Sequence, residues 1–219
     1  MPFATAALAV ALGAALLDWL AVARDALALE RIAKPAVIVA LIGVALAAGG
    51  PFDLGRWLLL AALVASLAGD ALLLPPGRFV PGLVAFLVAQ LAYLGRFLLR
   101  PASIAGLAVG LIAAGGLLAR AGRPILGGAA RAGLRLPVAI YLTAICAMAV
   151  AATATGAAAT GSLATIAGAW LFVASDTALG WDRFVAPPAT PGRETTLRRL
   201  AVIVPYHLGQ VLLVASLTG

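Results

Sequence analysis

The sequence has a single cysteine, a single histidine and few charged residues. One cysteine cannot form a disulfide framework within the chain or a thiolate zinc site, so we interpret Cys146 as a small core residue. Only 11% of the residues are charged, whereas soluble domains average about 25%. Long stretches of alternating polar and apolar residues are also missing. Their absence argues against a transmembrane β-barrel, whose strands alternate over roughly ten residues.

Apolar residues dominate instead. They make up 64% of the 219 residues, and the mean hydropathy is +1.12. This composition predicts an all-α polytopic membrane protein with one transmembrane domain over residues 1–219. We expect eight helical spans in one bundle, at roughly 2–23, 33–50, 57–75, 79–99, 101–119, 135–155, 161–181 and 199–218. The longest expected loops are 120–134 and 182–198, and the segment 186–192 within the second should be irregular because it is rich in proline.

Basic residues are distributed unevenly between the two ends of this predicted bundle. Three arginines fall at one end, and these are Arg56, Arg96 and Arg100. The other end holds twelve basic residues, which are Arg24, Arg31, Lys34, Arg78, Arg120, Arg123, Arg131, Arg135, Arg183, Arg193, Arg198 and Arg199. The positive-inside rule therefore predicts that the richer end faces the cytoplasm and that both chain ends lie outside, in a cell (inner or plasma) membrane. The net charge of +7 thus reflects orientation, and we expect no nucleic-acid partner.

Two apolar stretches each contain one buried acid. Asp70 lies in the stretch from Leu58 to Pro76, and Asp176 lies in the stretch from Leu163 to Leu179 with Ser175 beside it. An isolated carboxylate at the centre of a membrane helix costs roughly 2.5–3.5 kcal/mol even on lenient scales, so such residues usually mark functional sites. A purely structural role, in which each acid pairs with Lys34 or an arginine and joins helices, remains the alternative.

Further polar residues fall at a similar depth in the predicted bundle. Lys34 and Pro35 would begin the second span, where the lysine could extend to the interface or hold a lipid phosphate. Asp18 lies near the end of the first span, where it could contact headgroups or take part in a site. The remaining candidates to line one cavity are Gln90, Tyr93, Tyr206, His207 and Gln210. Pro205 permits a kink just before the last three. Tyr93 could equally be a contact between helices.

Five motifs in this order resemble the YhhN family of lysoplasmalogenase-like membrane proteins. They are AKPA at 33–36, SLAGDALLLPP at 66–76, FLVAQLAYLGRF at 86–97, ASDTALGWDRF at 174–184 and YHLGQ at 206–210. The resemblance implies an eight-helix fold and hydrolysis of the vinyl ether bond of lysoplasmalogens. Lys34, Asp70, Asp176, Tyr206 and Gln210 match the family pattern. Two positions depart from it: Gln90 stands where many members have histidine, and His207 stands where many have a second aromatic residue.

Vinyl ether hydrolysis begins with transfer of a proton to carbon, which leaves an oxocarbenium ion that water then attacks. This chemistry suits one protonated carboxyl group and one carboxylate. We therefore predict Asp70 and Asp176 as the catalytic pair, in one dry chamber long enough for a lipid tail. Lys34, Gln90, Tyr93, Ser175, Tyr206, His207 and Gln210 would bind a lysophospholipid substrate, with no metal and no cofactor. A lipid or small-molecule carrier with functional carboxylates is the alternative, and the oligomeric state stays open.

Overall fold

The computed structural model describes residues 2–49, 51–75 and 77–218. Within these ranges the chain forms helices and no strands. The helices are α1 (Pro2–Ala23), α2 (Leu27–Ala47), α3 (Leu54–Leu73), α4 (Phe79–Leu98), α5 (Ile104–Leu117), a π-turn (Leu118–Gly122), α6 (Arg123–Arg131), α7 (Arg135–Gly156), α8 (Leu163–Phe184) and α9 (Arg193–Thr218). Gly50, at the expected end of the second span, and Pro76, at the end of the stretch around Asp70, lie outside the described residues.

The prediction of a polytopic helical membrane protein is confirmed. Among the described residues, seven helical segments are long and apolar enough to cross a membrane. One of them is the continuous segment Ile104–Arg131, which combines α5, the π-turn and α6. The second helix, α2, is not among the seven, and its first two turns carry Glu30, Arg31 and Lys34. It nevertheless lies within the bundle, where it packs against α1, α3 and α9.

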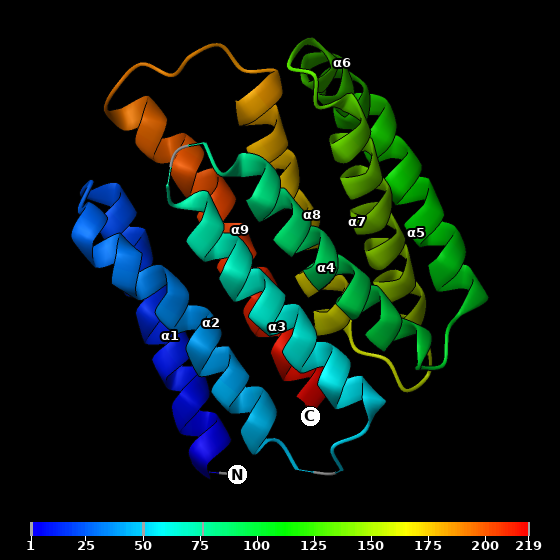
Figure 1. Cartoon of the computed structure of the whole chain (residues 1–219). Helices are drawn as coiled ribbons and strands as arrows, with labels where there is room; N and C mark the ends of the chain where they lie inside the picture. The colour runs from blue at the N-terminus through cyan, green and yellow to red at the C-terminus, as the bar shows by residue number, and fades with distance from the viewer. Residues whose placement is uncertain (1, 50, 76, 219) are drawn as a thin grey trace.

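The helices run side by side, and α1 begins at the same end of the bundle as α9 ends (Figure 1). Three consecutive pairs, α1–α2, α3–α4 and α8–α9, pack as antiparallel neighbours. Helix α9 also contacts α1 and α2, while α7 joins α8 to α4 and α5. This order brings α2, α3, α4, α7, α8 and α9, which carry most of the predicted site residues, into one continuous core.

The expectation of a loop over residues 120–134 is wrong. The segment 120–134 is helical as far as Arg131, because Ile125 and Ala129 pack into an apolar cluster with Val138 and Leu142 of α7. Just before Pro124, which has no N–H to donate, the backbone widens, and the N–H of Arg123 donates to the carbonyl of Leu118.

The second helix begins earlier than expected. It begins at Leu27, so Lys34 and Pro35 lie about two turns inside α2 and do not head it. The proline-rich segment 186–192 is irregular, as expected, although the connection is shorter because α8 continues to Phe184 and α9 begins at Arg193.

Glycines allow the closest helix contacts. A Cβ atom on Gly209 of α9 would lie 2.8 Å from the carbonyl oxygen of Gly168 on α8, and one on Gly168 would lie 3.0 Å from the oxygen of Gly209. Gly106 and Gly110 meet α7 in the same way. Such close approach of small residues is a common means of helix association in membranes. The crossing of α8 and α9 positions Asp176 and Tyr206 in the same core.

Candidate functional site

Asp70 lies near the end of α3 and is only 2% exposed. Its Oδ1 atom is 3.3 Å from the ammonium nitrogen of Lys34 on α2, and its Oδ2 atom accepts a hydrogen bond of 2.8 Å from the hydroxyl of Tyr206 on α9. Lys34 is 15% exposed, so it points into the bundle and does not extend into the interface. Two helices, α2 and α9, thus supply the carboxylate on α3 with a cation and a hydroxyl donor.

Asp176 on α8 forms a second group with different partners. Its Oδ2 atom accepts hydrogen bonds from the hydroxyl of Tyr141 on α7 and, at 3.3 Å, from the side-chain amide of Gln90 on α4. Asp176 and Tyr141 line a cavity of about 30 Å³ whose other walls are apolar. That volume is enough for about two water molecules. In this arrangement the space beside Asp176 is therefore much smaller than the expected tail-sized chamber.

An aromatic cluster packs beside both groups of polar residues. The ring of Phe86 lines the cavity beside Asp176 and packs edge-on against Tyr206, with 5.7 Å between ring centroids. Phe172 packs against both Phe86 and Tyr206. Gly69, next to Asp70, makes room for this arrangement, since a Cβ atom there would lie 2.6 Å from two ring carbons of Phe86. The ring of Phe86 thus packs against a partner of Asp70 and lines the cavity beside Asp176.

A buried polar chain lies one turn deeper than Asp70. The hydroxyl of Tyr93 donates to Oε1 of Gln210 at 2.5 Å, and the amide of Gln210 donates to Ser66 at 2.9 Å. This chain joins α4, α9 and α3, so Tyr93 is indeed a contact between helices. Ser175 is turned toward α9, where its hydroxyl donates to the backbone carbonyl of Val202 at 2.8 Å. These bonds hold the helices that carry the two acids.

Asp18 and His207 form a third buried group, between α1 and α9. Both side chains are 0% exposed, so of the two possibilities for Asp18 the structure excludes contact with headgroups. The indole N–H of Trp19 donates to Nδ1 of His207 at 3.2 Å, and that nitrogen is 4.0 Å from Oδ2 of Asp18. The ring of His207 also packs beside Tyr206, with 5.4 Å between centroids. This group therefore adjoins the partners of Asp70.

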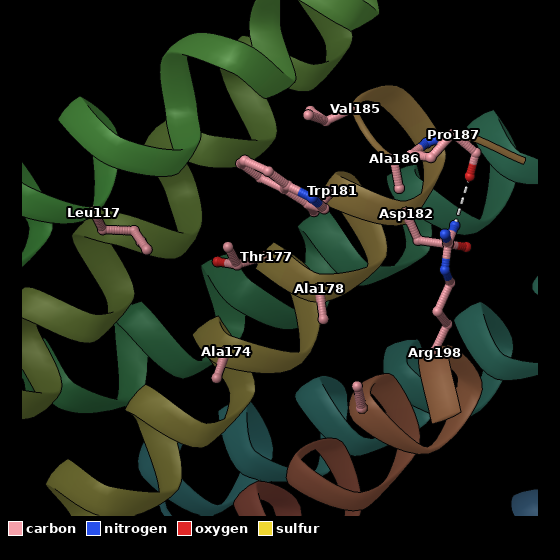
Figure 2. Close-up of a pocket in the computed structure, with 11 residues that line it drawn as sticks. Leu117, Ala174, Thr177, Ala178, Trp181, Asp182, Val185, Ala186, Pro187 and Arg198 are labelled. Carbon is pink, nitrogen blue, oxygen red and sulfur yellow. Dashed lines mark hydrogen bonds and ion pairs between the residues drawn. The ribbon is translucent and has the colours of Figure 1, made fainter. Parts of the chain in front are cut away.

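A larger groove lies on another face of α8. It has a volume of about 760 Å³ and is lined by Ala174, Thr177, Ala178 and Trp181 of α8, with the connection to α9 at its rim. Figure 2 shows Arg198 of α9 reaching toward Pro187 and Asp182 at this rim. These α8 residues are spaced by one helical turn and lie on the side away from Asp176. The groove is therefore separate from the two carboxyl groups.

Sequence reasoning missed Tyr141, Phe86 and Phe172. Tyr141 was overlooked because it stands in an apolar run with no motif around it, although a lone hydroxyl in a membrane helix is itself a signal for a buried partner. Phe86 and Phe172 have no polar side-chain atom, so only the fold reveals that they pack against Tyr206, a partner of Asp70. In the described part of the chain, no three histidine, cysteine or acidic side chains come close enough to hold a metal ion.

Comparison with known proteins identifies the family of this chain. A model of the YhhN family matches residues 29–217, from α2 to the end of α9. The chain belongs to the YhhN family. It is 34% identical to lysoplasmalogenase TMEM86B from Mus musculus over 172 residues, which cover 78% of this chain and 67% of the relative.

Two further relatives carry the same name. The protein from Homo sapiens is 33% identical over 73% of this chain and 62% of its own length, and that from Rattus norvegicus is 32% identical over 84% and 70%. No solved structure matches the chain. All the residues that contact Asp70 and Asp176 lie within the segment that matches the YhhN family, whereas Asp18 and Trp19 precede it.

The two carboxyl groups of this YhhN-family protein are held in chemically different ways. Asp70 has a cation on one oxygen and a hydroxyl on the other, an arrangement that suits a stable carboxylate. Among the described residues, the donors to Asp176 are neutral and both bind Oδ2, so Oδ1 is available to carry a proton. The two acids also lie close enough to interact electrostatically. Such a difference between neighbouring acids suits a division into proton donor and anion.

Proposed function

We propose that this protein is a membrane-embedded hydrolase of the vinyl ether bond of lysoplasmalogens, or of a closely related lysolipid. The products would be a fatty aldehyde and a glycerophospho-alcohol. The observation that carries the proposal is the pair of differently held acids, Asp70 and Asp176, whose surroundings share Phe86 in the apolar core of a YhhN-family chain. Similarity to three proteins named lysoplasmalogenase supports the same reaction.

In the proposed reaction, Asp176 is the general acid. Its proton, carried on Oδ1, passes to the β-carbon of the vinyl ether, and the electron pair of the double bond forms the new C–H bond. The resulting oxocarbenium ion is stabilised by the Asp70 carboxylate, which then accepts a proton from the attacking water. In the collapse of the hemiacetal the carbon–oxygen bond breaks, Asp70 gives its proton to the leaving glycerol oxygen, and the hemiacetal hydroxyl returns a proton to Asp176, so that aldehyde and alcohol are released and both acids regain their starting states. Tyr141 and Gln90 keep Asp176 oriented, and Tyr206 does the same for Asp70.

The substrate must reach the space between the two acids. We propose that the ring of Phe86, which packs against Tyr206 and lines the cavity beside Asp176, swings aside and that the vinyl ether takes its place. Lys34, bound to Asp70 and still partly exposed, can also contact the lipid phosphate on the side toward the charged end. The chain formed by Tyr93, Gln210 and Ser66, together with the bond from Ser175 to α9, then serves to hold the helices.

His207 and the orientation of the bundle complete the proposal. His207, beside Tyr206, would border the substrate space and not contact the reacting atoms.

The twelve-to-three distribution of basic residues supports an orientation with the charged end, and with it the site, toward the cytoplasm. Because the chain has one cysteine, which is buried, cysteines introduced singly at Arg100 and Arg193 would report the two sides by their reaction with an impermeant maleimide.

The reaction can be tested with the purified protein in detergent and deuterium oxide. A 1-alkenyl lysophospholipid should release aldehyde that carries one deuterium at the carbon next to the carbonyl, because the proton donor exchanges with solvent. Immediate reduction of the aldehyde to the alcohol prevents later exchange. Matched 1-acyl and 1-alkyl lysophospholipids should give no product. Uptake of lysolipid into proteoliposomes without release of aldehyde would overturn the proposal and favour a carrier.

A further inference from the structure

Asp18 is a buried acid that the proposed reaction does not use. It lies on α1 with no exposed surface, and in the described part of the chain neither of its oxygens has a hydrogen-bond partner. The two acids of the site differ in this respect, because Asp70 and Asp176 each accept at least one hydrogen bond. A buried polar group without a partner is uncommon in folded proteins, so the chemical state of Asp18 calls for an explanation.

The nearby imidazole does not provide a counter-charge. Trp19 donates its indole N–H to Nδ1 of His207, so that nitrogen is an acceptor and the ring hydrogen lies on Nε2. Asp18 Oδ2 is 4.0 Å from the same Nδ1 atom, and two acceptors without a proton between them repel each other. His207 in this tautomer is neutral. The pairing of Asp18 with His207 is therefore not an ion pair.

The neighbouring cations are engaged elsewhere. The charged groups that act on Asp18 are Lys34 and Glu30 of α2, Asp70 of α3 and Arg199 of α9. Lys34 forms an ion pair with Asp70, and Arg199 binds Glu30 and, at 3.2 Å, Asp25. An ionised Asp18 would thus be a second buried anion with no cation in contact, and it would compete with Asp70 for Lys34.

We propose that Asp18 carries a proton at neutral pH and that its neutral state keeps Lys34 bound to Asp70. Asp18 is then a positioning residue that acts through Lys34 and does not touch the substrate. When Asp18 loses its proton at alkaline pH, the new carboxylate attracts Lys34, and Asp70 loses its cation. The effect on kinetics rests on the proposed function. Asp18 would set the pH above which aldehyde release declines.

The test compares Asp18→Asn with the wild type and with Asp53→Asn. Asparagine has the shape of a protonated aspartic acid and cannot ionise. The control residue begins α3 at the other end of the bundle, where its side chain accepts from the N–H of Arg56, and asparagine caps a helix equally well. Infrared spectra at neutral pH should show protonated carboxyl absorption from both Asp18 and Asp176, of which Asp18→Asn loses the Asp18 component while Asp53→Asn loses none. This readout needs no enzymatic activity.

The pH profile of aldehyde release provides the second readout. Asp18→Asn should keep near-normal turnover at neutral pH, and its alkaline decline should move upward by about one pH unit or more, which corresponds to a tenfold change in the ionisation equilibrium. An unchanged infrared spectrum would mean that Asp18 carries no proton, and an unchanged profile would mean that Asp18 does not set the alkaline limit, so either result would overturn the proposal. If the wild type releases no aldehyde, the proposed function fails and the infrared band still decides the state of Asp18.

Discussion

Removing the hydroxyl of Tyr206 tests how Asp70 is used. Tyr206→Phe keeps the ring that packs against Phe86 and Phe172 and deletes only the 2.8 Å hydrogen bond to Asp70. A hydrogen bond to a charged group is worth about 1.5–3 kcal/mol. If this bond stabilises the Asp70 carboxylate in the transition state, kcat should fall roughly tenfold to 150-fold, at about tenfold per 1.4 kcal/mol. The assay is initial rates of aldehyde release by purified protein in detergent, with thermal unfolding measured on the same samples.

Tyr93→Phe is the matched control. Tyr93 is also fully buried, but its hydroxyl donates to the neutral amide of Gln210 and not to a carboxylate. Its loss should cost about 0.5–1.5 kcal/mol of stability, as for an ordinary hydrogen bond, and should leave kcat within a fewfold of wild type. Equal losses of activity in Tyr93→Phe and Tyr206→Phe, or full activity in Tyr206→Phe, would refute the reasoning.

Two glycine substitutions give further predictions. Gly209→Ala places a Cβ atom 2.8 Å from the carbonyl oxygen of Gly168 and should destabilise the protein by about 1–3 kcal/mol in detergent unfolding, as overpacking does. The control Gly13→Ala should leave stability unchanged, because nothing lies within 4 Å of the new atom. Equal effects of the two substitutions would contradict the packing argument. Gly69→Ala forces the ring of Phe86 away from α3 and should reduce aldehyde release by roughly tenfold or more. Adding Phe86→Leu to Gly69→Ala should restore part of the aldehyde release, because the smaller side chain leaves room for the new methyl group. If the double variant recovers no activity, displacement of the Phe86 ring is not the cause of the loss.

Hydrophobic composition and charge distribution were enough to predict the fold class. Long apolar runs with basic residues between them leave the backbone no alternative to helices inside a membrane. The helix ends were harder, because sequence signals there compete with packing. Pro35 looked like the start of a helix, yet α2 extends to Leu27. Four arginines between residues 120 and 135 looked like a loop, yet Ile125 and Ala129 bury an apolar face that keeps the segment helical.

The polar residues of the candidate site were visible in the sequence because a buried acid or amide stands out in an apolar run. Their partners were not, since contact between distant helices follows from the packing order and not from spacing. Asp176 therefore appeared without Tyr141, and Asp18 without His207. The place of Phe86, beside Tyr206 and in the wall of the cavity at Asp176, could not be predicted at all, because a phenylalanine in a membrane helix has no distinguishing signal.

The central claim is that two unlike carboxyl groups from α3 and α8 act together on one bond, and asparagine substitutions test it most directly. Asp70→Asn and Asp176→Asn should each reduce turnover of a purified 1-alkenyl lysophospholipid by about 10²–10⁴-fold, the usual contribution of a general acid or base. The control Asp182→Asn, whose side chain pairs with Arg198 at the rim of the separate groove, should remain active. Near-normal turnover in a folded Asp70→Asn or Asp176→Asn protein would contradict the account.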